Sequence, residues 1–195
     1  YALCRPPGHH AMRSQAGGYC YLNNAAIAAR FLQQRHAGMR VAVLDFDFHH
    51  GNGTQEIFYS DPSVLYVSLH GDPDEEFPFQ WGGADERGEG PGQGYNVNVP
   101  LPPGTDEARY LEAFDDSLAT IRDFAPIFLV VSVGFDIAVG DPAAIGDSFK
   151  ITANGFRALG ERIRALNLPT ILVQEGGYRL DTLAENGQAF LKVFA

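Results

Sequence analysis

Apolar residues occur along this chain in short unbroken runs, and each run is followed by a polar cluster that contains glycine. The runs are rich in β-branched residues and cover residues 41–44, 64–69, 127–133 and 170–173. Strands that are apolar throughout, rather than at alternate positions, are buried on both faces, which is typical of parallel sheets. The pattern therefore predicts an open parallel sheet flanked by helices.

Four further segments have apolar residues at the spacing of amphipathic helices, namely residues 21–34, 106–124, 152–166 and 181–193. Residues 71–104 instead carry glycine and proline throughout, which predicts a long loop and, within it, a short extended piece at 95–99. Loops of this length are usually functional or disordered. The chain shows no internal repeat or linker, so residues 1–195 are expected to form a single α/β domain.

The composition excludes several classes of protein. Hydrophobic residues make up 45% of the chain and charged residues 19%, which excludes a disordered or collagen-like chain. The net charge of −10 argues against nucleic acid and anionic membranes as partners and favours a cationic one. No apolar run approaches the ~20 residues that cross a bilayer. Two cysteines, Cys4 and Cys20, are too few for a disulfide framework, so we expect reduced thiols and a cytoplasmic location.

Side chains that can bind a metal follow two of the predicted strands. Ligands bind beyond the carboxyl ends of the strands in open parallel sheets, so these clusters are expected to converge. In an extended stretch Asp45, Asp47 and His49 lie on one side, and Asp136 is the best candidate for a further ligand. Two carboxylates and one imidazole suit a catalytic Zn²⁺ or another divalent ion. A solvated turn would explain an isolated Asp-x-His pair, but this one follows a buried strand.

Two other positions carry groups suited to proton transfer. His9 and His10 follow a turn set by proline and glycine, and histidine is the side chain best matched to acid and base roles near neutral pH. A pair of surface histidines is an equally good interpretation of this dipeptide alone. The Tyr178 hydroxyl could donate to a developing oxyanion, although a buried structural tyrosine is the simpler interpretation of that residue alone.

Together these motifs resemble the histone deacetylase superfamily. Five of the family's motifs stand in the family's order, at residues 5–11, 18–24, 45–53, 134–136 and 175–178. The resemblance implies an arginase-like α/β fold and zinc-dependent hydrolysis of acetylated amines. Because the sequence begins at Tyr1 and enters directly on the first motif, we expect it to be a C-terminal part of that fold without the N-terminal portion.

The resemblance also assigns roles. It implies that Asp47, His49 and Asp136 bind zinc, and that water attacks the amide. His9 and His10 would together supply the general base and the general acid. The oxyanion donor would be Tyr178, and the tunnel that holds the acyl group would be lined by Gly18 and Tyr19.

Structural potassium ions are a second implication of the resemblance. One site would involve Asp45, which would also orient His9, together with Ser68, Leu69 and backbone oxygens of Asp47 and His49. A second site would involve the backbone near Phe58, Asp61, Val64 and Tyr95. Asn52 stands where some members carry an aspartate, so His10 lacks a carboxylate partner.

Residues 70–86 are similar to the loop of the bacterial acetylpolyamine amidohydrolases, which narrows the tunnel and takes part in dimerisation. The resemblance implies a cationic acetylated small-molecule amine as substrate and a homodimer formed through residues 71–94. Between residues 72 and 89 a single basic residue, Arg87, faces seven acids: Asp72, Asp74, Glu75, Glu76, Asp85, Glu86 and Glu89. Such a loop would attract a polycation, whose methylenes or ammonium groups could stack on Phe77, Phe79 or Trp81. A merely solvated acidic loop is the alternative.

Three other functions remain open at this point. A protein acetyl-lysine deacetylase would use the same chemistry behind a more open rim. A fragment of this fold could be a non-catalytic binding module. An arginase-like hydrolase with two metals is disfavoured because it would require more ligands than these clusters supply.

Overall fold

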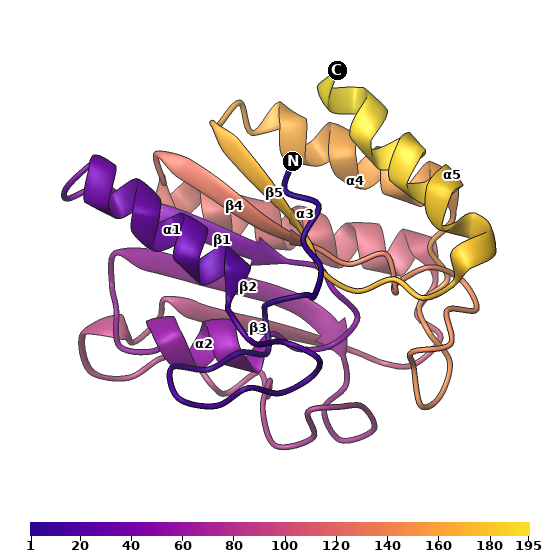
Figure 1. Ribbon diagram of the computed structural model, residues 1–195, viewed down its shortest axis with the longest axis horizontal. Helices are drawn as coiled ribbons and strands as arrows, with labels where there is room; N and C mark the ends of the chain where they lie inside the picture. The colour runs from indigo at the N-terminus through magenta and orange to yellow at the C-terminus, as the bar shows by residue number, and fades with distance from the viewer.

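Five parallel strands form the centre of the molecule, in a computed structural model that describes residues 1–195. The strands are β1 (Val41–Asp45), β2 (Val64–Gly71), β3 (Asn96–Leu101), β4 (Phe128–Val133) and β5 (Thr170–Gln174). They lie in the order β3-β2-β1-β4-β5, and every neighbouring pair is parallel (Figure 1). The predicted parallel α/β architecture is confirmed.

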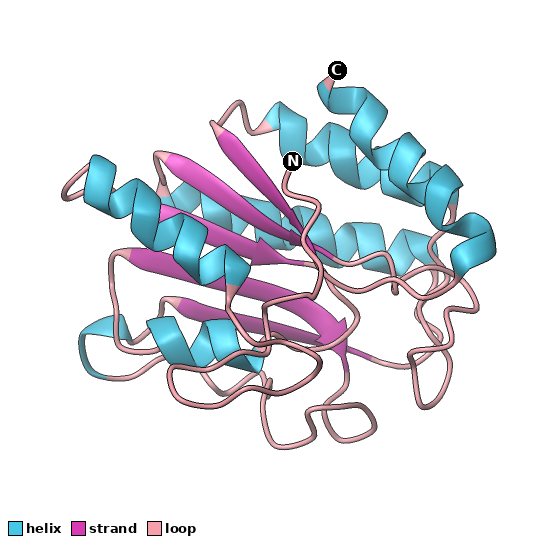
Figure 2. Ribbon diagram, in the orientation of Figure 1, coloured by secondary structure: helices cyan, strands magenta, loops and turns pink.

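Helices cover both faces of this sheet. Figure 2 shows α1 (Asn24–Arg35) and α2 (Asn52–Phe58) in front of the sheet and α3 (Glu107–Phe124) behind it. The helices α4 (Ala153–Ala165) and α5 (Leu180–Leu191) pack against each other beside β5, and two short 3₁₀ turns lie at Gly90–Gly92 and Lys192–Phe194. None of the helices has both the length and the apolar character required to cross a membrane.

The strands divide the hydrophobic core into two clusters because successive side chains point to opposite faces. Val41 and Val43 of β1 pack with Ala25 and Ala29 of α1. Ala42 and Leu44 belong to a larger cluster on the opposite face, which includes Phe114, Leu118, Phe156 and Phe190 of the helices α3, α4 and α5. Strands buried on both faces explain why the apolar runs do not alternate.

The structure adds one short helix to the predicted elements and shifts their bounds by one to three residues. Helix α2 was not predicted, because seven residues are too few to show a helical period. The extended piece predicted at 95–99 is β3, which forms one edge of the sheet. At the other edge, the backbone N–H of Ala2 donates to Leu172 and the N–H of Gln174 donates to Ala2, so β5 is partly covered by the first residues.

The strand order determines where a ligand can bind. From β1 the chain moves outward through β2 to β3, and it then crosses to the other side of β1 to form β4. The direction of winding therefore changes between β1 and β4. In open α/β sheets the binding crevice lies at the carboxyl ends of the strands at such a point.

Candidate active site

Three acidic and imidazole side chains meet at this point of the sheet. Asp47 and His49 directly follow β1, and Asp136 follows β4. Each offers one ligand atom, and the three atoms lie within 4.8 Å of one another. His49 Nδ1 is 3.4 Å from Asp47 Oδ1 and 3.3 Å from Asp136 Oδ2. The predicted convergence of these residues is confirmed.

The local backbone brings them together by turns rather than by an extended strand. Strand β1 ends at Asp45 and residues 47–49 bend. The backbone N–H of Asp47 donates to Asp45 Oδ1 at 3.2 Å, and the N–H of His49 donates to Asp47 Oδ1 at 2.9 Å. The expectation that Asp45, Asp47 and His49 form one row of a strand was therefore wrong, because aspartate side chains bond to the backbone two residues ahead.

The cluster has the features of a cation site. Asp136 Oδ2 is buried and makes no hydrogen bond, although a buried polar atom of this kind normally has a partner. A Cβ atom at Gly176 would lie 2.5 Å from Asp136 Oδ2 and 2.7 Å from Asp47 Oδ2, so only glycine leaves this space open. Two carboxylates and an imidazole are a donor set that zinc accepts. These residues fit a divalent metal ion.

Electrostatics within the cluster agree with that assignment. Burial, followed by the charge of Asp47, raises the pKa of Asp136 to about 7. Burial would also raise the pKa of Asp47, but His9 and His49 outweigh it and lower that pKa below its usual range. Although burial opposes a charged imidazole, the carboxylates of Asp136 and Asp47 beside the ring raise the pKa of His49 to about 10. When both are charged, the two buried carboxylates repel each other, and a bound cation would offset this repulsion.

The adjacent histidines differ in their partners. His9 Nδ1 is 3.1 Å from Asp45 Oδ2, whereas His10 Nδ1 is 2.7 Å from the amide oxygen of Asn52. Burial disfavours charge on both rings. For His9 the carboxylates Asp47 and Asp45 overcome burial and raise its pKa well above the usual value. For His10 burial and the neighbouring His9 hold the pKa well below it. The pair therefore offers one charged and one neutral imidazole.

Two buried residues without a predicted role hold the backbone around these histidines. The carboxylate of Glu175 accepts from the N–H of Gly8 at 2.6 Å and of His9 at 3.2 Å. Asn23 donates to the carbonyl of Ala11 at 3.1 Å while its oxygen caps α1. An acid in a glycine-rich turn after a buried strand was the signal that could have identified Glu175.

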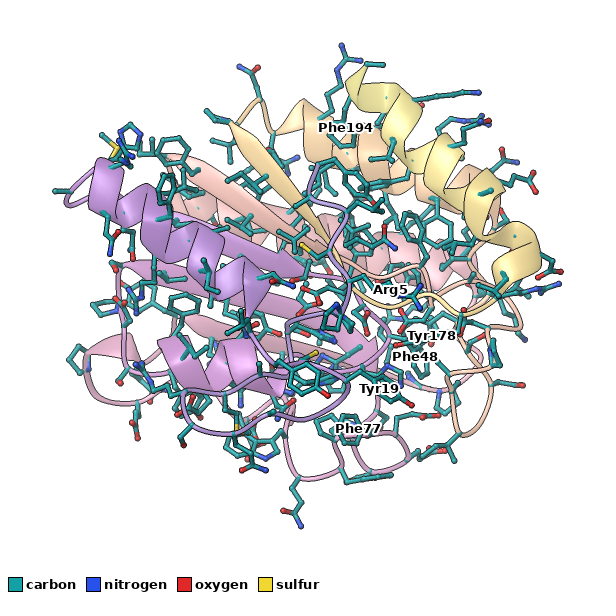
Figure 3. All side chains as sticks on the ribbon, viewed as in Figure 1. Arg5, Tyr19, Phe48, Phe77, Tyr178 and Phe194 are labelled. Atoms are coloured by element: carbon teal, nitrogen blue, oxygen red, sulfur yellow. The ribbon has the colours of Figure 1, made fainter.

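A cavity of about 560 Å³ opens above the cluster. Figure 3 shows Tyr19, Phe77 and Tyr178, from three separate loops, gathered at one end of the molecule. Tyr178 is 38% exposed, and burial followed by the charges of Asp47 and Asp136 raises its pKa, so its hydroxyl stays protonated and able to donate. The cavity is lined by Pro7, His9, His10, Gly18, Tyr19, Asp47, His49, Phe77, Pro142, Ala143, Gly176 and Tyr178.

Two of the residues expected to contact the substrate, Gly18 and Tyr19, line the cavity. A Cβ atom at Gly18 would lie 2.1 Å from the His10 ring, which explains the glycine there. Tyr19 adopts a φ of +65°, which bulky residues rarely do. Phe79 does not line the cavity: it is 52% exposed and packs edge-on against Phe77, which does. Phe77, which was also expected to face the substrate, lies in the wall, and the substrate contact of Phe79 stays a prediction.

The residues expected to hold potassium form two groups, one on β1 and β2 and one near the end of α2. Asp45 and Ser68 are neighbours across these strands, with Leu69 beside them, and Ser68 Oγ is 2.8 Å from His70 Nδ1. The second group follows α2, where the carbonyls of Phe58, Asp61 and Tyr95 accept from the N–H groups of Asp61, Val64 and Tyr66. Both potassium sites stay predictions.

The sequence matches known proteins along its whole length. The model of the histone deacetylase domain matches residues 1–194. An acetylpolyamine amidohydrolase of Burkholderia pseudomallei is 56% identical over 194 residues, which cover 100% of this chain and 55% of that protein. Human histone deacetylase 7 is 42% identical over 197 residues, which cover 97% of this chain and 20% of that protein.

Solved structures agree with these matches. The crystal structure of the acetylpolyamine aminohydrolase from Burkholderia pseudomallei superimposes with a TM-score of 0.94 at 55% identity, covering 100% of this chain and 55% of that one. The HDA15 HD domain superimposes with a TM-score of 0.89 at 40% identity, covering 97% and 55%. The chain thus spans about half the length of the acetylpolyamine amidohydrolases that it matches. Since the family model covers residues 1–194, this chain belongs to the histone deacetylase family.

Proposed function

We propose that this chain carries the catalytic residues of a zinc-dependent amidohydrolase that removes acetyl groups from acetylated polyamines. The observation that carries the proposal is the convergence of Asp47, His49 and Asp136 beside a cavity that His9, His10 and Tyr178 also line. The names of the bacterial relatives supply the substrate class.

Each side chain around the cavity would have its own role in hydrolysis of the acetyl amide. Zinc held by Asp47, His49 and Asp136 would polarise the acetyl carbonyl and lower the pKa of water. Burial and the charge of His9 favour the neutral form of His10, which can take a proton from water. A carboxylate partner favours the protonated form of His9, which can return a proton to the leaving amine. The protonated hydroxyl of Tyr178 donates to the developing oxyanion.

Four acids of the long loop support a cationic substrate, while two others have structural contacts. The buried Glu76 accepts from the N–H groups of Ile145 and Gly146, and Glu86 accepts from Gln55 and Gly82. The exposed acids Asp74, Glu75, Asp85 and Glu89 remain to attract an amine. We further propose structural potassium at the two predicted sites and a homodimer formed through residues 71–94, where the ring of Phe79 is exposed.

Acetate release tests this function. The zinc-loaded chain is expected to hydrolyse acetylputrescine faster than an acetyl-lysine peptide, and the activity is expected to vanish in Asp136→Ala. The matched control is Asp123→Ala, an exposed acid on α3 that should leave both rates unchanged. Preference for the peptide would instead indicate a protein deacetylase, a function compatible with the 42% identity to human histone deacetylase 7. No activity in a folded, zinc-loaded chain would contradict the proposal.

Replacing Tyr178 by phenylalanine removes one hydroxyl from the cavity wall. Loss of a single donor to an oxyanion lowers kcat by roughly 10²–10³-fold in other hydrolases, and we expect a loss of this size in Tyr178→Phe. KM should change little, because the donor acts mainly in the transition state. Steady-state kinetics with acetylputrescine measure both constants, and wild-type kcat in the variant would exclude this role for Tyr178.

A further inference from the structure

Asp141 lies in the loop between β4 and α4, next to Pro142 and Ala143, which line the cavity. It is only 5% exposed, yet it contacts no basic side chain through a salt bridge. Its carboxylate accepts from three backbone N–H groups instead. Oδ2 accepts from Tyr178 at 2.8 Å and from Arg179 at 2.9 Å, and Oδ1 accepts from Ala143 at 3.0 Å.

These bonds join two parts of the cavity wall. Ala143 and Tyr178 both line the cavity, but they come from loops 35 residues apart that have no strand or helix in common. A further hydrogen bond joins the same two loops, because the guanidinium of Arg179 donates to the carbonyl of Val139. A buried carboxylate that accepts several N–H groups forms short, charge-assisted hydrogen bonds. The backbone at Tyr178 is therefore fixed by Asp141.

The loop around Asp141 is itself held in place. The N–H of Asp141 donates to Ser148 Oγ at 3.2 Å, and Ser148 Oγ donates to the carbonyl of Ala138 at 2.9 Å. By contrast, the ring of Tyr178 is 38% exposed, and none of the hydrogen bonds in the structure involves its hydroxyl. Tyr178 thus depends on its backbone for its position.

We infer that Asp141 is a positioning residue for Tyr178: it holds the tyrosine where its hydroxyl meets the developing oxyanion, and it joins that tyrosine to the part of the cavity wall at Ala143. The inference rests on the proposed function, because it gives Asp141 a role through the oxyanion donor. A small displacement of a catalytic group is enough to lower a rate by roughly 10²-fold.

Kinetics of paired variants test this role. Asp141→Ala is expected to lower kcat by roughly ten- to hundredfold with KM within about twofold. Asp141→Asn, whose amide oxygen can still accept from Tyr178 and Arg179, should recover part of that loss. In the Tyr178→Phe background, Asp141→Ala should lower kcat by no more than about threefold, because the donor it positions is already absent. The control Asp147→Ala removes an exposed acid from the same loop.

A full additional loss of kcat in the Tyr178→Phe background would overturn the inference, as would a change in KM alone. Amide hydrogen exchange gives a second readout that does not depend on activity. In Asp141→Ala the amides of Tyr178 and Arg179 should exchange more than about tenfold faster, while those of α4 keep their rates. Unchanged exchange at both amides would also overturn it. If the unmodified chain releases no acetate, the proposed function is wrong, and exchange alone decides whether Asp141 holds Tyr178.

Discussion

At the scale of single residues, His70 shows how burial determines charge. Its ring is fully buried at the end of β2, with Nδ1 2.8 Å from Ser68 Oγ and Nε2 3.0 Å from the carbonyl of Gly82. A carbonyl can only accept, so Nε2 donates, and in the neutral ring Nδ1 then accepts from the hydroxyl. Burial lowers the pKa of His70 to about 4, and the ring of His50, 4.6 Å away, is held neutral by burial as well.

The lowered pKa of His70 predicts a loss of stability in acid. Between about pH 6.5 and pH 4 the unfolded chain binds a proton at this position that the folded chain does not, so stability falls as the pH falls through this window. Urea unfolding at pH 7 and pH 5 should show that His70→Gln reduces the difference in unfolding free energy by roughly 1–2 kcal/mol. The exposed His36 gives the control His36→Gln, and an equal pH dependence in both variants would contradict this account.

At the scale of elements, the sequence predicted the strands and helices whose apolar residues follow a regular pattern. Four strands and four helices were evident because they are long enough to show a pattern of burial. The turns at Asp45 and Asp47 and the short helix α2 were not, because they are too short to show a period. The contacts of Asp141 and Glu175 were not, because hydrogen bonds between distant loops leave no local pattern. The ligand triad was nevertheless predictable, since strand order alone brings the ends of β1 and β4 together.

Glu76 connects two loops that flank the cavity, and its removal should loosen them. Its carboxylate accepts from Ile145 at 2.9 Å and from Gly146 at 2.9 Å, and Phe77 beside it lines the cavity. Glu76→Ala is expected to lower the free energy of unfolding by roughly 1–2 kcal/mol and to raise KM for acetylputrescine. The adjacent Glu75 is exposed, so Glu75→Ala should change stability much less. Equal losses of stability in the two variants would show that these bonds are unimportant.

At the scale of the whole molecule, the site depends on the change of winding direction at β1. Strand β1 lies between β2 and β4, so the chain that follows it meets the ends of β4 and β5. The loop after β5 then contacts three parts of the site: Glu175 holds the backbone of His9, the N–H of Gly176 donates to Asp47 at 2.7 Å, and Tyr178 is bound by Asp141. The residues that we propose as metal ligands, proton-transfer groups and oxyanion donor are thereby fixed relative to one another.

The central claim is that Asp47, His49 and Asp136 form one metal site, and a zinc titration tests it most directly. Calorimetry on the metal-free chain at pH 7 should show one tight zinc ion per chain. Loss of a residue that only hydrogen-bonds to a metal ligand weakens metal binding by roughly 10- to 100-fold. Loss of a ligand itself should weaken it more, so we expect Asp136→Ala to bind zinc more than about a hundredfold more weakly. Asp123→Ala should bind as the unmodified chain does. Equal zinc affinity in Asp136→Ala would contradict the account.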